Sequence, residues 1–311
     1  MKPLRSLLPL LVAIAALLCI FAWWVPQGRF LTPANLMDLA QQISVNAILA
    51  FGLTLVILIG GIDLSVGAMV ALAGVVCVSA LNLTGPLGGL TAGLAAALLL
   101  GLINGYCAAR TRMPPFIITL ATMLIARGMA LGFNESRPLP IAEDQTWLLA
   151  LGNSRLGGWL PLPVIVMLIV FALSTVLLHR TRFGQHLYAI GGNREAARFT
   201  GIAISRHEVA VYAICGLCAG LAGLIHASQL YSAEPAAGQG FELNAIAAVV
   251  VGGTSFSGGI GALPGTLLGA MIIGILDKGL NQAGVHFSLQ YIVKGLVILG
   301  AVYLDVRRRK E

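Results

Sequence analysis

The side chains of this 311-residue chain that could bind or transform a solute are few, and most of them carry no charge. Amides and hydroxyls donate and accept hydrogen bonds, so they can bind a neutral, hydroxylated solute. Each of them could equally cap a helix or join two helices. The candidates, which lie in or beside apolar runs, are Asn46, Asp63, Ser65, Asn104, Gln229, Glu242, Asn244 and Gln290.

Asp63 is the acid inside the first half of the apolar sequence, with Gly60 and Gly61 shortly before it. A charge buried in a membrane is costly and usually functional. Asp63 also stands two residues before Ser65 at the start of an apolar run, where a carboxylate can cap a helix. The sequence leaves both roles open.

Several kinds of chemistry lack the residues that they need. The five histidines have no metal-ligand spacing, and the CxxC pair Cys215 and Cys218 has no further Cys or His near it, so two small residues on one helix face are expected there. None of the four lysines follows a glycine, as a Walker A phosphate loop requires. We therefore expect no catalytic residue, no metal and no cofactor in this chain, and an energy source that lies elsewhere.

Membrane helices must position the candidate residues. The chain is 58% hydrophobic and 10% charged, whereas soluble domains are about 25% charged. This composition predicts an all-α polytopic membrane protein, and membrane orientation explains the net charge of +7 better than nucleic acid does. The ten predicted spans, of which the eighth is short, are 7–25, 43–60, 64–81, 86–109, 116–133, 161–178, 209–227, 242–251, 262–280 and 289–304.

Basic residues predict the orientation of these spans. With the N-terminus inside, 13 of the 19 Lys and Arg fall in inner segments and 3 in outer segments. Positive residues gather on the cytoplasmic side of membrane proteins. We therefore expect both termini inside and one multi-pass transmembrane domain over residues 1–311.

The polar stretch His179–Glu208 interrupts the apolar pattern and holds five arginines. Asn193 can cap a short helix that ends near Thr200, and Gly201 can supply the left-handed residue that stops it. A helix of about seven residues is not stable alone. It must dock on the rest of the chain or on a partner, unless the stretch is an ordinary solvated loop.

Small residues at four-residue spacing predict two helix contacts. One stripe joins Gly89, Gly93, Ala97, Gly101 and Gly105, and the other joins Gly261, Gly265 and Gly269. A weak internal similarity also relates the two halves, because Asn46-Ala-Ile and Asn244-Ala-Ile each lead to a glycine pair. Matching breaks of this kind indicate a transport path near the midplane.

Longer motifs resemble a known family. They are Gly60-Gly-Ile-Asp-Leu-Ser-Val-Gly67, Tyr188-Ala-Ile-Gly-Gly-Asn193, Ala197-Arg-Phe-Thr-Gly-Ile202 and Glu242-Leu-Asn-Ala-Ile-Ala-Ala-Val-Val-Val-Gly-Gly-Thr254. In order and across nearly the whole chain, they are similar to permease subunits of sugar ABC importers of the ribose, xylose and galactose group. The resemblance implies import of a ribose-like monosaccharide by alternating access across a bacterial inner membrane.

The resemblance also implies partners: a cytoplasmic ABC ATPase that binds ATP, a periplasmic sugar-binding protein, a second permease copy or paralogue, and membrane lipid, but no nucleic acid. Within the cytoplasmic loop 179–208, a coupling helix would rest on the ATPase, with Ala197 as its most size-sensitive contact. The expected coupling residues are Gly191, Gly192, Asn193, Glu195, Ala196, Ala197, Arg198, Phe199 and Gly201. The alternatives are an ATP-independent secondary carrier or channel and a membrane-embedded enzyme.

Overall fold

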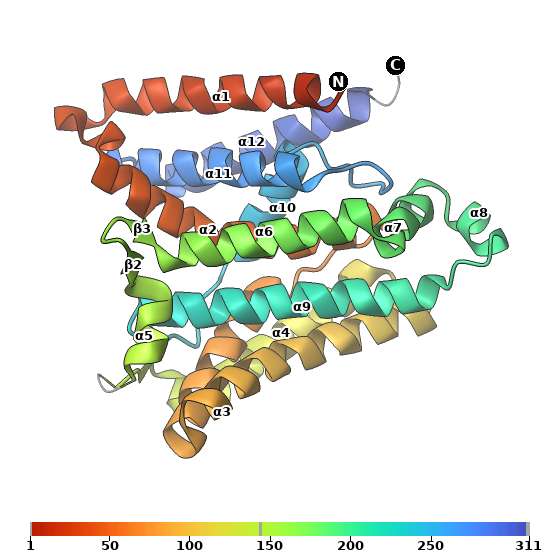
Figure 1. The fold of residues 1–311 in the computed structure, drawn as a ribbon, viewed down its shortest axis with the longest axis horizontal. Helices are drawn as coiled ribbons and strands as arrows, with labels where there is room; N and C mark the ends of the chain where they lie inside the picture. The colour runs from red at the N-terminus through yellow and green to blue at the C-terminus, as the bar shows by residue number, and fades with distance from the viewer. Residues whose placement is uncertain (1, 143–144, 309–311) are drawn as a thin grey trace.

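The structure is a computed structural model that describes residues 2–142 and 145–308. Most of this part of the chain is helical (Figure 1). The helices are α1 (Lys2–Trp24), η1 (Pro26–Leu31), α2 (Pro33–Leu58), α3 (Val66–Arg110), α4 (Pro115–Gly132), η2 (Phe133–Ser136), α5 (Thr146–Asn153), α6 (Leu162–Arg180), α7 (Arg182–Gly192), α8 (Arg194–Phe199), α9 (Ile204–Gln229), α10 (Phe241–Val251), α11 (Leu263–Gln282) and α12 (Phe287–Arg308).

Among the described residues, seven helices are long and apolar enough to cross a membrane: α1, α2, α3, α4, α6, α9 and α11. The chain is thus an all-α membrane protein, as predicted. α3 has 45 residues and contains the predicted third and fourth spans, which meet at a kink where Gly85 has a φ of 78°. α10 and α12 hold the shorter apolar segments. Arg309 and Lys310, which belong to the predicted inner basic cluster, lie outside the described residues.

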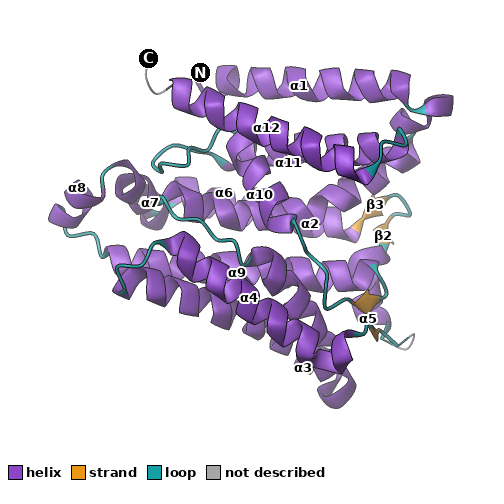
Figure 2. Cartoon of the chain, turned by 180° about the vertical axis from the view of Figure 1, so that it is seen from behind, coloured by secondary structure: helices purple, strands orange, loops and turns teal. Residues whose placement is uncertain are grey.

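The two ends of the bundle differ. In Figure 1 the start of α1, the end of α12, and α7 and α8 lie at one end, which we call the α8 end. Figure 2 shows the same arrangement from behind. The opposite end, the α5 end, holds α5 and two small antiparallel sheets, β1 (Leu139–Pro140) with β4 (Ser232–Ala233) and β2 (Arg155–Leu156) with β3 (Leu160–Pro161).

α2 lies in the middle of the bundle and contacts α6, α9, α10 and α11. From Ile43 to Leu58 every residue except Asn46 is buried. A helix that is apolar on all sides is stable only when it is surrounded. Cys215 and Cys218 help to surround it, because both pack against Gly52 of α2, as expected for small residues on a helix face.

Both predicted stripes are confirmed as contact surfaces, except that Gly261 precedes α11 and faces the side chain of Thr254. Gly93 faces the backbone of the first half of α3, whereas Gly101 and Gly105 lie against α9. Gly265 and Gly269 lie against α10. At each position an added Cβ would overlap a backbone atom, so side chains are excluded by contact between two backbones.

We predict that Gly101→Leu destabilises the bundle by about 1–3 kcal/mol, because its side chain would displace α9 at the Tyr212 carbonyl. Gly128→Leu is the matched control, since a Cβ at Gly128 meets nothing within 4 Å. Thermal unfolding of both purified variants in detergent measures the difference. Equal midpoints would show that the α3–α9 contact tolerates bulk.

Candidate functional site

Three cavities follow the N-terminal half of α2 and share lining residues. The cavity at the rim has a volume of about 250 Å³, the one beside α11 and α12 about 340 Å³, and the innermost about 170 Å³. Gln42 lines all three, and Gln229 lines both the rim cavity and the innermost one. Together they form a polar recess beside the buried helix.

The innermost cavity brings together three of the predicted path residues, Asn46, Gln229 and Asn244. They come from α2, α9 and α10, so no local pattern links them. Asn46 Oδ1 and Gln229 Nε2 are buried and have no hydrogen-bond partner among the described residues. One atom is an acceptor and the other a donor, which together match a hydroxyl group.

Three further polar residues line this cavity and were not predicted: Gln42, His226 and Asp277. Asp277 forms an ion pair with Lys294, with a distance of 3.0 Å between Oδ1 and Nζ. Single polar residues inside apolar runs are the signal that could have revealed them. Sequence position alone does not show that His226 of α9 and Asp277 of α11 line the same recess as Gln42 of α2.

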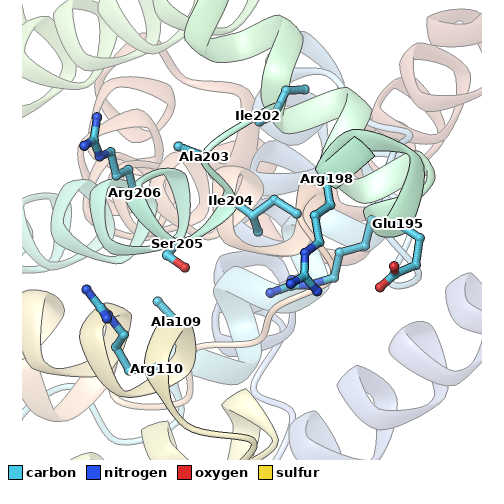
Figure 3. A pocket seen from close by; sticks show the side chains of 10 residues that line it. Ala109, Arg110, Glu195, Arg198, Ile202, Ala203, Ile204, Ser205 and Arg206 are labelled. Atoms are coloured by element: carbon cyan, nitrogen blue, oxygen red, sulfur yellow. The ribbon is translucent and has the colours of Figure 1, made fainter. Parts of the chain in front are cut away.

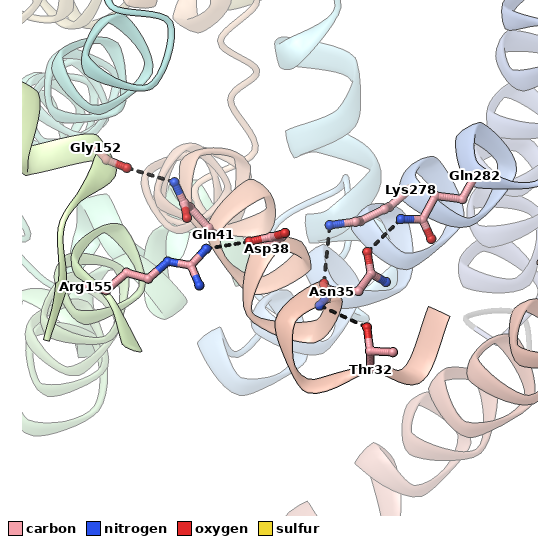
Figure 4. Close-up of polar contacts among 8 residues, drawn as sticks. All are labelled: Thr32, Asn35, Asp38, Gln41, Gly152, Arg155, Lys278 and Gln282. Carbon is pink, nitrogen blue, oxygen red and sulfur yellow. Dashed lines mark hydrogen bonds and ion pairs between the residues drawn. The ribbon is translucent and has the colours of Figure 1, made fainter. Parts of the chain in front are cut away.

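The rim of the recess is held by polar contacts at the start of α2 (Figure 4). Asp38 forms an ion pair with Arg155, with 2.7 Å between Oδ1 and Nη2. Gln41 donates to the Gly152 carbonyl at 2.8 Å. On the other side, Gln282 Nε2 of α11 donates to Asn35 Oδ1 at 2.6 Å. The start of α2 is thereby attached to both the α5 loop and α11.

Asp63, Ser65 and Asn104 also come together, but away from the recess. All three are fully buried. Asp63 Oδ1 accepts from the Ser65 backbone N–H (2.9 Å) and hydroxyl (2.5 Å), while Asn104 donates to Ser65 Oγ (2.9 Å) and accepts from Thr122 (2.6 Å). This network joins the α2–α3 connection to α3 and α4, and none of its residues lines the cavities described above.

The other two predicted path residues, Glu242 and Gln290, do not line the innermost cavity. Glu242 stands in the first turn of α10, where its Oε1 accepts from the Gly240 N–H at 3.2 Å. This is a capping contact. Gln290 lines the cavity beside α11 and α12, and it donates to the Val285 carbonyl at 2.8 Å.

The loop 179–208, for which a coupling role was predicted, contains α7 and α8, and α8 has the predicted ends. Asn193 Oδ1 accepts from the Ala196 N–H at 2.9 Å, so Asn193 is the N-cap. Gly201 has a φ of 82°, and the N–H of Ile202 bonds the carbonyl of Ala197 at 3.2 Å. These two features define a Schellman stop.

The face that α8 presents differs from the prediction. Ala197, the predicted most size-sensitive contact, is only 3% exposed because it packs against its own chain. Phe199 is 87% exposed. Glu195, Ala196 and Arg198 are exposed too. The outward surface of this helix is thus one aromatic ring with polar neighbours.

Three contacts attach this loop to the bundle. Tyr188 donates to the Gly261 carbonyl at 2.7 Å, and burial raises the pKa of its hydroxyl above the ordinary value, which keeps the proton in place. Gly191 approaches the backbones of Leu58 and Gly259 so closely that no Cβ fits, whereas Gly192 faces open space. Arg194 pairs with Glu208 of α9 at 2.7 Å.

A bundle of membrane helices with a polar recess at one end and an anchored loop at the other suits a polytopic permease. Residues 35–302 match the family model described as branched-chain amino acid transport system / permease component, and the chain belongs to this family.

The relatives include the ribose import permease protein RbsC of Escherichia coli K12, 43% identical over 96% of this chain and 93% of the relative. The protein of the same name from Bacillus subtilis 168 is 45% identical over 90% and 87%. The xylose transport system permease protein XylH of E. coli K12 is 35% identical over 99% and 94%. No solved structure matches the chain.

We predict that Gly201→Val loosens the end of α8, whereas Gly201→Asn preserves it. A Cβ here meets nothing within 4 Å, so only the positive φ opposes valine, at a cost of about 1–2 kcal/mol, while asparagine tolerates it. Hydrogen exchange of the Ile202 amide should be about 5- to 30-fold faster in the valine variant. Equal exchange in both variants would mean that the stop does not depend on Gly201.

Proposed function

We propose that this permease is the membrane subunit of an ATP-driven ABC importer that carries a ribose-like monosaccharide into the cytoplasm by alternating access. The unpaired acceptor of Asn46 and donor of Gln229, two residues that line one cavity, are the observation that carries the proposal. The ribose and xylose permeases among the relatives support the substrate class. A neutral sugar needs such hydrogen bonds and apolar walls rather than fixed charge.

The proposal includes an orientation. The protein would cross a bacterial inner membrane ten times, with both termini and the α8 end in the cytoplasm. The bias of basic residues supports this orientation. The polar recess would then open toward the periplasm, where a sugar-binding protein would deliver the substrate to this chain and to a second permease copy or paralogue.

The energy would come from a separate ATPase at α8. Phe199 is the natural anchor, because aromatic rings buried at an interface contribute much of the binding energy. Glu195 and Arg198 would supply polar contacts, and Asn193 and Gly201 would fix the helix ends. Ala197 would act indirectly, because its buried side chain packs α8 against the rest of the permease. Gly191 and Tyr188 would pass movement of the loop to the bundle.

We predict that Asn46→Leu and Gln229→Leu each lower the maximal rate of labelled ribose uptake by about 2- to 12-fold, the value of one hydrogen bond. Asn82→Leu is the matched control, because Asn82 is exposed on α3 and lines none of the three cavities. Uptake is measured in cells with matched permease expression. Unchanged rates in both cavity variants would remove the recess from the sugar path.

We further predict that Phe199→Ala weakens association with the ATPase by about 5- to 30-fold, since a buried aromatic anchor contributes about 1–2 kcal/mol or more. Trp159→Ala is the control, because Trp159 is a 62% exposed aromatic at the α5 end. Copurification of the ATPase and ATP-dependent uptake are the two measurements. Uptake that persists without an ATPase would instead identify a secondary carrier or channel.

A further inference from the structure

We propose that a basic cavity beside α8 binds the phosphate headgroup of an anionic phospholipid from the leaflet at the α8 end. The cavity has a volume of about 580 Å³ and lies between the end of α3, α8 and the start of α9 (Figure 3). The inference rests on the proposed orientation, which makes this leaflet the cytoplasmic one. It assigns the cavity a ligand other than the ATPase or the sugar.

The charge of the cavity fits a phosphate group. Four arginines and one acid, Glu195, line it. Arg194 is already paired with Glu208 and Arg198 belongs to the proposed ATPase contact, which leaves Arg110 and Arg206 for a headgroup. Figure 3 shows the side chains of Arg110 and Arg198 on either side of Ser205. Guanidinium groups bind phosphate oxygens in a bidentate manner, and exposed ones do so without a cost of burial.

The surface beside the cavity fits an acyl chain. Leu99, Ile103 and Tyr106 of α3 are 57%, 52% and 60% exposed, and their spacing places them on one helix face that leads to Arg110. The guanidinium of Arg110 lies 6.0 Å from the centre of the Tyr106 ring. Tyrosine and arginine at the end of an apolar stripe mark the level of the lipid headgroups.

Charge and apolar surface together favour a lipid over an acidic side chain of the ATPase. A carboxylate would use the arginines but would leave the stripe of α3 without a role, whereas one phospholipid contacts both. Basic pockets between membrane helices at the cytoplasmic face suit anionic headgroups. A bound headgroup would connect α3, which ends at Arg110, to α8, which begins only at Arg194.

The test compares two double variants of the full-length permease. Arg110→Gln/Arg206→Gln removes two cavity arginines that lie outside the proposed ATPase contact. Arg180→Gln/Arg182→Gln makes the same change in charge at two exposed arginines of the α8 end that do not line the cavity. Native mass spectrometry of the purified proteins measures binding of phosphatidylglycerol, with phosphatidylcholine and inorganic phosphate as competitors.

We expect one saturable phosphatidylglycerol site in the parent and the control variant, and about 25-fold weaker binding in the cavity variant, or about fivefold for each arginine. Equal binding in the two variants overturns the proposal. Displacement of phosphatidylglycerol by phosphatidylcholine would also overturn it. So would displacement of phosphatidylglycerol by inorganic phosphate, if the phosphate competes as effectively as phosphatidylglycerol itself. Loss of ATPase copurification with unchanged lipid binding would assign the cavity to the ATPase instead.

Failure here remains distinguishable from failure of the proposed function. Lipid binding is measured on the isolated permease and needs neither sugar nor ATPase. Phe199→Ala should retain full phosphatidylglycerol binding, because Phe199 does not line the cavity. If transport proves independent of ATP, the lipid result still stands, and a negative lipid result leaves uptake and copurification unaffected.

Discussion

Backbone groups that leave a helix inside a membrane bundle must find partners in the protein, because hydrocarbon offers none. Two segments, 59–65 and 234–240, leave the helical pattern before α3 and before α10. Both are held by α4. Thr119 bonds backbone groups of the first segment at 3.2 and 3.3 Å, and Arg127 donates to two carbonyls of the second at 2.9 and 2.6 Å. One helix at the side of the bundle thus supplies side-chain partners to backbone groups in both interruptions.

The glycine-rich turns provide a second constraint, since they bring backbones into direct contact. The N–H of Gly259 donates to the Leu58 carbonyl at 2.8 Å, which joins the turn after α10 to the end of α2. Gly191 of α7 rests on both, and Tyr188 holds the same turn through Gly261. Contacts between backbones have no flexible side chains to absorb displacement. Movement of α7 would therefore be transmitted to two helices at once.

The features that could be predicted from the sequence are those with a local signal. The cap at Asn193 and the stop at Gly201 depend on a few neighbouring residues, so the ends of α8 were predictable. The face of α8 was not, because a helix of six residues has too short a pattern to show which side packs, and Ala197 proved to be buried. Asp63 could not be assigned either, because its network uses residues of α3 and α4 far along the chain.

The internal similarity gains meaning from these contacts. Asn46 and Asn244 occupy matching positions in the two halves and line the same cavity. The turns that follow them, after Leu58 and Val251, meet each other at the α8 end. α2 and α10 therefore run side by side. Their polar groups line the recess, and the glycine turns at their ends contact α7. A push at α7 would shift both asparagines together, which changes the cavity without requiring any single side chain to move far.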